Sequence, residues 1–191
     1  MIGVLAAAVV AAWPGDWRPG PAEARRLAAG DVVVEMQPDP GRSSGVIHAA
    51  VDIPTPAHRI WALLQSCANA PTIVKFVTSC RIVSHGPPDT WEVREDMIET
   101  VFFLPKLRSL IRTDAAPERE IRFHCLPGSD LRVCDGSWRL EATPAGAVRV
   151  TYASTVGSPY PVPDFIIRSV LGAGMAESMR KLRTLATTPG P

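Results

Sequence analysis

The feature that most constrains this chain is a proline-rich segment followed by a long helical pattern near the C-terminal end. Pro159, Pro161 and Pro163 stand at alternate positions. Because each proline lacks an N–H group and has a fixed φ, neither a strand ladder nor a helix can pass through this segment. Asp164 then offers an N-cap side chain to a helix. The residues that form one apolar or small helical face after it are Ile167, Leu171, Gly174, Ser178, Leu182 and Leu185. This pattern predicts one long helix, which we expect to lie across a curved antiparallel sheet.

Upstream of this helix, short strand patterns alternate with turn signals rich in proline and glycine. They cover residues 32–36, 46–53, 76–84, 91–103, 107–113, 119–126, 131–141 and 147–156. One helical segment interrupts them, with Thr55 as the predicted N-cap and Pro56 at the first helical position. Its predicted buried face consists of Ile60, Leu63, Leu64 and Cys67. Strands, a short helix pair, more strands and a long helix indicate an α+β fold.

The N-terminal end carries an uninterrupted apolar run over residues 2–12. A membrane-spanning helix needs about 20 apolar residues, whereas a shorter run is typical of a secretory signal peptide. The alternatives are a short apolar helix packed on the domain, or a misassigned start codon. We therefore expect a signal peptide over 1–12, a linker and short helix over 13–30, one domain over 31–187 and a tail over 188–191. If this signal peptide is cleaved, we expect an exported protein in the periplasm or envelope. If it is not, we expect a cytoplasmic protein.

The charge and the spacing of cysteine and histidine exclude several classes of function. A net charge of +1 provides no basic surface for nucleic acid, so we expect no nucleic-acid partner. The chain has neither a C-x-x-C pair nor a histidine pair with metal-ligand spacing. We therefore expect no metal and no cofactor.

The four cysteines allow two interpretations. If the protein is exported, a disulfide can join Cys125 and Cys134, which flank a predicted hairpin. As diagonal neighbours they would lie about 7–8 Å apart, which is long for a disulfide. The alternative is that all four cysteines are small buried apolar residues.

Several motifs occur in an order that resembles a known superfamily. They lie at residues 27–31, 51–56, 60–61, 128–131, 136–140, 150–152 and 158–163. Together they resemble the START-related (SRPBCC) superfamily over residues 27–187, and within it the polyketide-cyclase and coenzyme-Q-binding-protein-like group. The resemblance implies a helix-grip fold. In that fold a curved antiparallel sheet of about six or seven strands carries two short helices and one long C-terminal helix across its concave face. It also implies a deep apolar cavity between the sheet and that helix, for a lipid, an isoprenoid quinone, a sterol or a polyketide.

Large apolar side chains, together with small residues in the long helix, are candidates for the lining of such a cavity. The predicted ligand-binding residues are Trp91, Met97, Phe102, Phe103, Phe123, Trp138, Tyr152, Phe165, Ile166, Val170 and Gly174. The alternative for each large side chain is an ordinary place in the core. The glycines at 172 and 174 indicate either room for a ligand or close packing of the helix on the sheet.

The apolar residues 101–105 end a strand pattern near Tyr160 in the proline-rich segment. We expect them to form a gate at the cavity mouth that makes transient contact with a membrane surface. The alternative is a buried strand end.

Glu95 and Tyr152 are the weak candidates for catalysis. Glu95 shares its side of the strand with Trp91 and Met97, so a place in the cavity would raise its pKa and suit it to proton transfer. The alternative is an ion pair with a cross-strand arginine, namely Arg108, Arg112 or Arg122.

Three functions are consistent with this pattern. The first is binding or transport of a hydrophobic small molecule by a protein that is not an enzyme. The second is a cyclase or dehydratase that uses a cavity carboxylate. The third is a macromolecular interaction module, which predicts a filled interior and a large exposed apolar patch.

Overall fold

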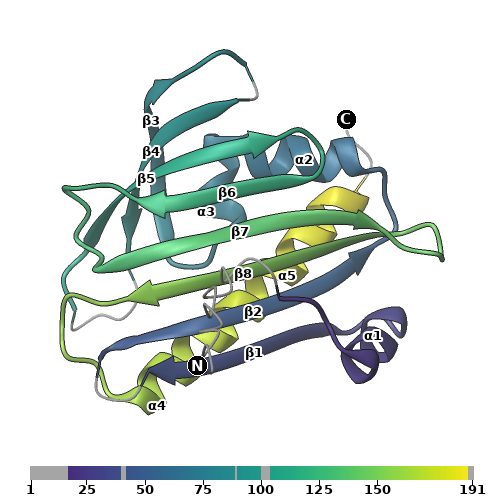
Figure 1. Ribbon diagram of the computed structural model, residues 1–191, viewed down its shortest axis with the longest axis horizontal. Helices are drawn as coiled ribbons and strands as arrows, with labels where there is room; N and C mark the ends of the chain where they lie inside the picture. Colours follow the sequence, from purple (N-terminus) through teal and green to yellow (C-terminus); the bar gives the residue numbers. More distant parts are fainter. Residues whose placement is uncertain (1–16, 40–41, 89, 100–103, 189–191) are drawn as a thin grey trace, which may run out of the picture.

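The computed structural model describes residues 17–39, 42–88, 90–99 and 104–188. Its centre is an eight-stranded sheet with the strand order β1-β2-β8-β7-β6-β5-β4-β3 (Figure 1). The strands are β1 Val32–Asp39, β2 Ser44–Ile53, β3 Val77–His85, β4 Trp91–Ile98, β5 Leu107–Ala116, β6 Glu120–Cys125, β7 Val133–Ala142 and β8 Val148–Gly157. All neighbouring strands are antiparallel.

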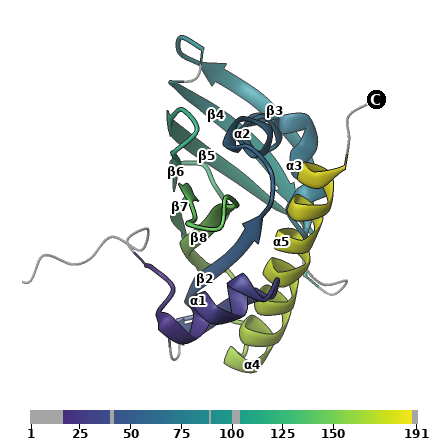
Figure 2. The ribbon, with the colours of Figure 1, turned by 90° about the vertical axis from the view of Figure 1, so that its right-hand side faces the viewer.

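The helices lie at both ends and between β2 and β3. They are α1 Pro21–Ala28, α2 Ala57–Gln65, η2 Cys67–Asn69, α3 Ala70–Ile73, α4 Asp164–Ile166, the π-helical segment η3 Ile167–Leu171, and α5 Gly172–Thr187. Figure 2 shows α5 against one face of the sheet, with α2 and α3 near its C-terminal end. We call the face that α5 covers the inner face. The predicted α+β helix-grip architecture is confirmed, with eight strands in place of six or seven.

The opposite face, which we call the outer face, carries α1. Leu27 of α1 packs on Val33 and Ala50, whose side chains point away from α5, and Trp17 covers the edge of this cluster. Gly30 follows the helix with φ +91°. A glycine suits the end of α1, because it adopts this backbone conformation without a steric penalty.

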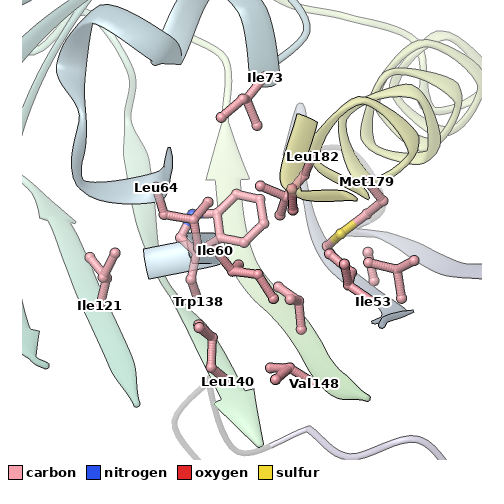
Figure 3. Packing of buried hydrophobic residues seen from close by; sticks show 14 of the residues in the cluster. Ile53, Ile60, Leu64, Ile73, Ile121, Trp138, Leu140, Val148, Met179 and Leu182 are labelled. Atoms are coloured by element: carbon pink, nitrogen blue, oxygen red, sulfur yellow. The ribbon is translucent and has the colours of Figure 1, made fainter. Parts of the chain in front are cut away.

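Apolar side chains fill part of the space between α5 and the sheet (Figure 3). Met179 and Leu182 of α5 are fully buried against Ile53 and Ile60. Trp138 also belongs to this cluster. Each such side chain contributes about 1.5–3 kcal/mol by leaving water. This cluster holds α2 and the second half of α5 on the sheet.

The buried face of the long helix differs from the predicted one. Leu171 and Leu185 are half-buried, whereas Met175, Met179 and Ala186 are buried. Leu171 is the last residue of the π-helical segment η3, where side chains are displaced from the ordinary helical positions. The predicted positions Ile167, Gly174, Ser178 and Leu182 are buried.

The two predicted helix caps are wrong. Pro56 and Pro163 occupy the N-cap positions of α2 and α4, and neither helix has a side-chain cap hydrogen bond. Thr55 Oγ1 instead donates to Ala186 O at 3.2 Å and links the start of α2 to the end of α5. Asp164 is the first residue of α4, where its charge favours the positive end of the helix dipole.

All four cysteines form disulfides, so the interpretation as free buried residues is wrong. Cys125 and Cys134 are bonded with a Cα–Cα distance of 5.2 Å. The register that pairs Phe123 with Gly136 places these two cysteines directly opposite each other, not diagonally. Cys67 of η2 bonds to Cys80 of β3, a pairing that was not predicted from the sequence.

Across the described ranges, each helix is too short or too polar to cross a membrane.

The glycines of α5 provide a test of the helix packing. A Cβ atom on Gly174 would lie 2.4 Å from Phe76 Cε2, whereas one on Gly172 would have no neighbour within 4 Å. We expect Gly174→Ala to destabilise the fold by about 1–3 kcal/mol through overpacking. Gly172→Ala should stabilise it by about 0.5–1 kcal/mol through helix propensity. In thermal unfolding each kcal/mol corresponds to about 2–4 °C. Shifts of equal sign in the two variants would contradict this packing.

Candidate functional site

Next to this core, between the sheet and the helical segment from α4 to α5, lies a pocket of about 190 Å³. The sheet contributes Ile47, Val77, Ile98, Leu107, Tyr152 and Val156, and the helical segment contributes Ile166, Ile167, Val170, Leu171, Gly174, Met175 and Ser178. The connecting segments contribute Ser43, Val74, Lys75, Phe76, Leu104, Leu131, Ser158 and Val162. The lining is dominated by aliphatic and aromatic side chains, so the pocket favours an apolar occupant.

The pocket lies where the helix presents small residues. Gly174 and Ser178 face it, and Ser178 Oγ donates to Gly174 O at 3.0 Å, so its hydroxyl is satisfied within the helix. The proline-rich segment contributes Ser158 and Val162 to the lining. For scale, an engineered apolar cavity of about 150 Å³ takes up benzene. The present volume therefore fits a small apolar body or one segment of a longer chain.

The wall on the helix side consists largely of a π-helical turn. Ile167, Val170 and Leu171 of η3 line the pocket. Ser169 Oγ of this turn donates to Phe165 O of the preceding α4 at 2.8 Å. π turns often occur at functional sites, because they displace side chains from the ordinary helical positions.

The following part of α5 is held by polar contacts. Lys75 N donates to Ser178 Oγ at 2.9 Å, and Lys75 Nζ lies 3.1 Å from Glu177 Oε2. Arg183 Nη1 donates to Gly30 O at 2.6 Å. Two of these residues, Lys75 and Ser178, also line the pocket, so these contacts hold part of its wall.

Four of the predicted ligand-binding residues line this pocket: Tyr152, Ile166, Val170 and Gly174. Binding of a ligand by them stays a prediction. Phe123 and Trp138 lie beside Tyr152, with ring centroids 5.9 Å and 4.6 Å from its ring. Both are buried in the core cluster and do not line the pocket.

The remaining apolar candidates have other positions. The side chain of Phe165 is 71% exposed next to the lining residue Ile166. Phe102 and Phe103 lie outside the described residues. The predicted gate and its contact with a membrane surface stay predictions.

The predicted orientation of β4 is wrong, because the residues that face α2 and the pocket are Glu92, Arg94, Asp96 and Ile98. Arg94 Nη1 and Nη2 donate to Leu64 O and Gln65 O at the end of α2, at 3.3 Å and 2.6 Å. Ile98 lines the pocket. Because side chains alternate along a strand, those of Trp91, Glu95 and Met97 point to the outer face and cannot line this pocket.

Trp91 instead borders a second, polar pocket at the strand end, lined also by His85, Glu92 and Thr113. The guanidinium of Arg112 lies 4.5 Å from the centre of its ring. This cation–π contact explains the half-buried position of the indole without a ligand.

Glu95 forms an ion pair on the outer face. Its carboxylate lies 2.8 Å from Arg81 Nη2 and 3.0 Å from Arg108 Nη1. The hydrogen bond from Arg81 is the largest cause that lowers the pKa of Glu95, and Arg108 adds to it. Its assignment as a cavity carboxylate is therefore wrong, and the alternative of an arginine pair holds.

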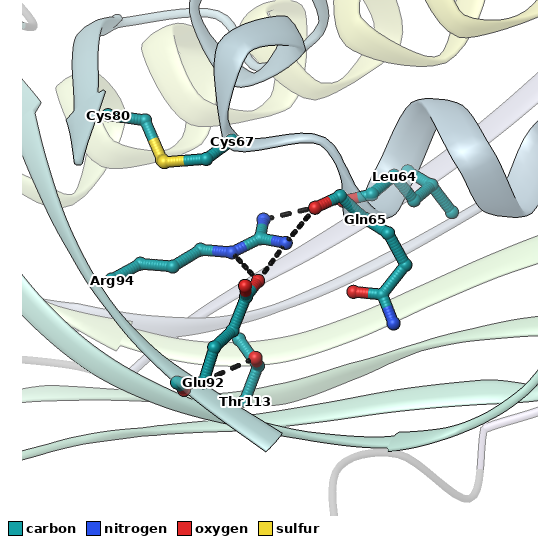
Figure 4. The surroundings of a disulfide bond; sticks show 7 residues. All are labelled: Leu64, Gln65, Cys67, Cys80, Glu92, Arg94 and Thr113. Atoms are coloured by element: carbon teal, nitrogen blue, oxygen red, sulfur yellow. Dashed lines mark hydrogen bonds and ion pairs between the residues drawn. A yellow bond between two sulfur atoms is a disulfide. The ribbon is translucent and has the colours of Figure 1, made fainter. Parts of the chain in front are cut away.

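A buried ion pair on β4 connects the sheet to α2 (Figure 4). Arg94 is only 8% exposed and is paired with the neighbouring Glu92 on the same face. The guanidinium uses its other donors on the last carbonyl groups of α2, which carry the negative end of the helix dipole. This pair was not predicted from the sequence, because a charged alternating face ordinarily points to solvent.

Asp96, the next residue on this inner face, differs from Arg94 in having no direct partner. Among the described residues, no group donates a hydrogen bond to its buried Oδ1. Burial is the main cause that raises the pKa of Asp96 to about 6. The positive charge of Arg94 lowers this pKa, and the negative charge of Glu92 raises it. A buried carboxylate oxygen without a donor is unusual and calls for a physical explanation.

Tyr152 places a phenol in the apolar wall. Burial raises its pKa, although a hydrogen bond with Ser154 acts in the opposite direction. The hydroxyl therefore stays protonated near neutral pH and can donate a hydrogen bond.

Across the part of the chain that the structure describes, no three histidine, cysteine or acidic residues cluster as metal ligands would. The absence of a cofactor stays a prediction.

The comparisons with known proteins agree with this architecture. Residues 53–182, more than half of the chain, match the family described as polyketide cyclase / dehydrase and lipid transport. No curated protein matches the chain significantly.

Solved structures share the fold at low sequence identity. A STAR-related lipid transfer protein from Xanthomonas axonopodis is 14% identical, with 82% of this chain and 94% of that chain covered and a TM-score of 0.68. The Zhui aromatase/cyclase from Streptomyces sp. R1128 is 13% identical, with 75% and 93% covered and a TM-score of 0.63. A START superfamily protein from Mycobacterium smegmatis is 12% identical, with 74% and 96% covered and a TM-score of 0.61. At these identities the likeness shows the fold alone.

The carboxyl of Asp96 predicts a pH-dependent stability. Its pKa in the folded state, about 6, lies above the ordinary value of 3.8, so the folded protein binds more protons between these values. Stability therefore falls as the pH rises from about 4 to about 6. We expect Asp96→Asn to stabilise the fold at pH 7 by on the order of 1–3 kcal/mol, with no gain at pH 4.

Urea unfolding of both proteins at pH 4 and pH 7 measures this difference. Glu95→Gln is the matched control on the outer face. It should not stabilise the fold at pH 7, because arginine contacts lower the pKa of Glu95. A gain for Asp96→Asn that is the same at both pH values would show that the buried charge of Asp96 is not its cause.

Proposed function

The chain belongs to the polyketide cyclase / dehydrase and lipid transport family, as the START-like motifs predicted, and we propose that it binds and carries a hydrophobic small molecule. The observation that carries this proposal is the apolar pocket between the sheet and the helical segment from α4 to α5. Two structural neighbours, one named as a lipid transfer protein and one as an aromatase/cyclase, represent the two activities that this pocket could serve.

The driving force is burial of apolar ligand surface, at about 25 cal/mol per Å². A ligand that buries about 300 Å² gains about 7 kcal/mol before the entropic cost of association, which is at least about 4 kcal/mol. The expected affinity for a small ligand is therefore weak. A lipid or isoprenoid chain can place one segment in the pocket, whereas a sterol or a fused polyketide needs more room than about 190 Å³.

An enzyme of the cyclase or dehydratase type is the second candidate. It is favoured by Asp96, whose pKa of about 6 suits proton transfer, and by the protonated phenol of Tyr152. Among the described residues, however, the pocket lining itself contains no carboxylate: Asp96 lies next to the lining, one position beyond Ile98 on the same face, and Glu95 is directed away from it. Carriage therefore ranks first.

An interaction module ranks last. It predicts a filled interior, whereas this interior holds a pocket. Among the described residues the large exposed apolar side chains are Ile82, Val83 and Phe165. Two of them lie on the edge strand β3 and the third lies on α4, which argues against one large apolar patch.

A pocket-filling variant tests the carrier. Leu171 lines the pocket, so we expect Leu171→Trp to lower the affinity for the fluorescent fatty acid cis-parinaric acid at least tenfold. Arg180→Trp introduces the same side chain at an exposed position of the same helix and should leave the affinity unchanged. Binding is measured by fluorescence titration, and far-UV circular dichroism checks folding. Equal affinity in both folded variants, or no binding by the unmodified protein, would refute the proposed function.

We also propose that the protein works in an oxidising compartment, which the Cys67–Cys80 and Cys125–Cys134 disulfides support. Disulfides of this kind persist in secreted and periplasmic proteins and are rare in the cytosol. Protein taken from its own cells into acid and then alkylated should carry no alkyl group on any cysteine, as measured by intact mass. Four alkylated cysteines would place it in a reducing compartment.

A further inference from the structure

We propose that Asp96 and Ser109, which lie next to the pocket lining without being part of it, form a polar anchor that binds a hydroxyl group of the ligand. This proposal rests on the proposed function. It adds an orientation to the ligand, because the hydroxyl end lies at the anchor and the apolar chain fills the pocket. It also adds a chemical class, an amphipathic alcohol.

The position of the anchor follows from the strand register. Ile98 pairs with Leu107, and both residues line the pocket. The next pair on the same face along these two strands is Asp96 with Ser109. The anchor therefore lies one step further along the same wall.

The anchor has free hydrogen-bonding capacity. Asp96 Oδ1 is buried without a donor among the described residues. Ser109 is 3% exposed, and its Oγ has a weak partner, Cys134 Sγ, at 4.0 Å. A buried acceptor that stays unpaired costs about 1–3 kcal/mol, so a ligand that supplies a donor recovers this energy.

The neighbouring charges do not satisfy Asp96. The guanidinium of Arg94 is bonded to Glu92 and to the carbonyl groups of Leu64 and Gln65. The charges of Arg94 and Glu92 compensate each other in their ion pair. The carboxylate of Asp96 is therefore a hydrogen-bond acceptor that this ion pair does not use.

The carboxylate of Asp96 and the hydroxyl of Ser109 together favour a ligand that carries a hydroxyl group. A carboxylate oxygen only accepts hydrogen bonds, whereas a serine hydroxyl can donate one. An alcohol can donate to Asp96 and accept from Ser109 at the same time. An ether cannot donate, and an ammonium group cannot accept and loses more hydration on entering an apolar pocket.

Two small probes of equal size test the anchor. 1-Octanol and 1-methoxyheptane have the same number of non-hydrogen atoms, but only the alcohol can donate a hydrogen bond. Isothermal titration of the full chain should give a Kd for 1-octanol about tenfold lower than for the ether, as expected for one additional hydrogen bond. In Asp96→Leu this ratio should fall to about one. In Glu95→Leu, the same change at the neighbouring outer-face residue, the ratio should stay about tenfold. Ser109→Ala, a milder change, should lower the ratio if Asp96→Leu does not fold.

The outcomes separate this inference from the function on which it rests. Equal binding of both probes to the unmodified protein would overturn the anchor and leave the apolar carrier intact. No binding of either probe would overturn both. Tighter binding of octylammonium than of 1-octanol would overturn the assignment of a hydroxyl. An unchanged preference for the alcohol in folded Asp96→Leu and Ser109→Ala would overturn the anchor, because the ligand hydroxyl would then donate its hydrogen bond to another residue.

Discussion

The contact between the second half of α5 and the inner face of the sheet supports the rest of this structure. Met179, Leu182 and Ala186 are fully buried there, and Thr55 binds the last turn through Ala186 O. These contacts fix the C-terminal end of the helix against the sheet. The first half then carries small residues and a π turn over the sheet, and the interior stays partly open at that end.

Much of the fold could be predicted from periodicity. Alternation with turn signals predicts antiparallel strands, and the helical spacing after Pro163 predicts the terminal helix. The apolar cavity was implied by the ordered motifs of the START-like resemblance. Details at helix starts were less predictable: Thr55 has the residue type of a cap, but its hydroxyl bonds to a carbonyl more than a hundred residues away in the chain.

The site was harder to predict than the fold. Alternation along β4 shows which side chains share a face, but it cannot show which face points inward. Hydrophobicity suggested the side with Trp91 and Met97, whereas the inner side is the one with Glu92, Arg94 and Asp96. The reason is tertiary: the carbonyl groups at the end of α2 satisfy Arg94, and this helix is distant in sequence. The pairing of Cys67 with Cys80 likewise depends on how η2 lies on β3, for which the sequence has no local signal.

The Cys67–Cys80 disulfide also restrains one wall of the pocket. It closes a covalent ring that contains α3 and the lining residues Val74, Lys75 and Phe76. Lys75 is bonded in addition to Ser178 and Glu177 of α5. This wall is therefore tied at both ends, by a covalent bond and by the helix. The lining residues of α4 and η3 lie outside this ring and follow directly on a connection rich in proline.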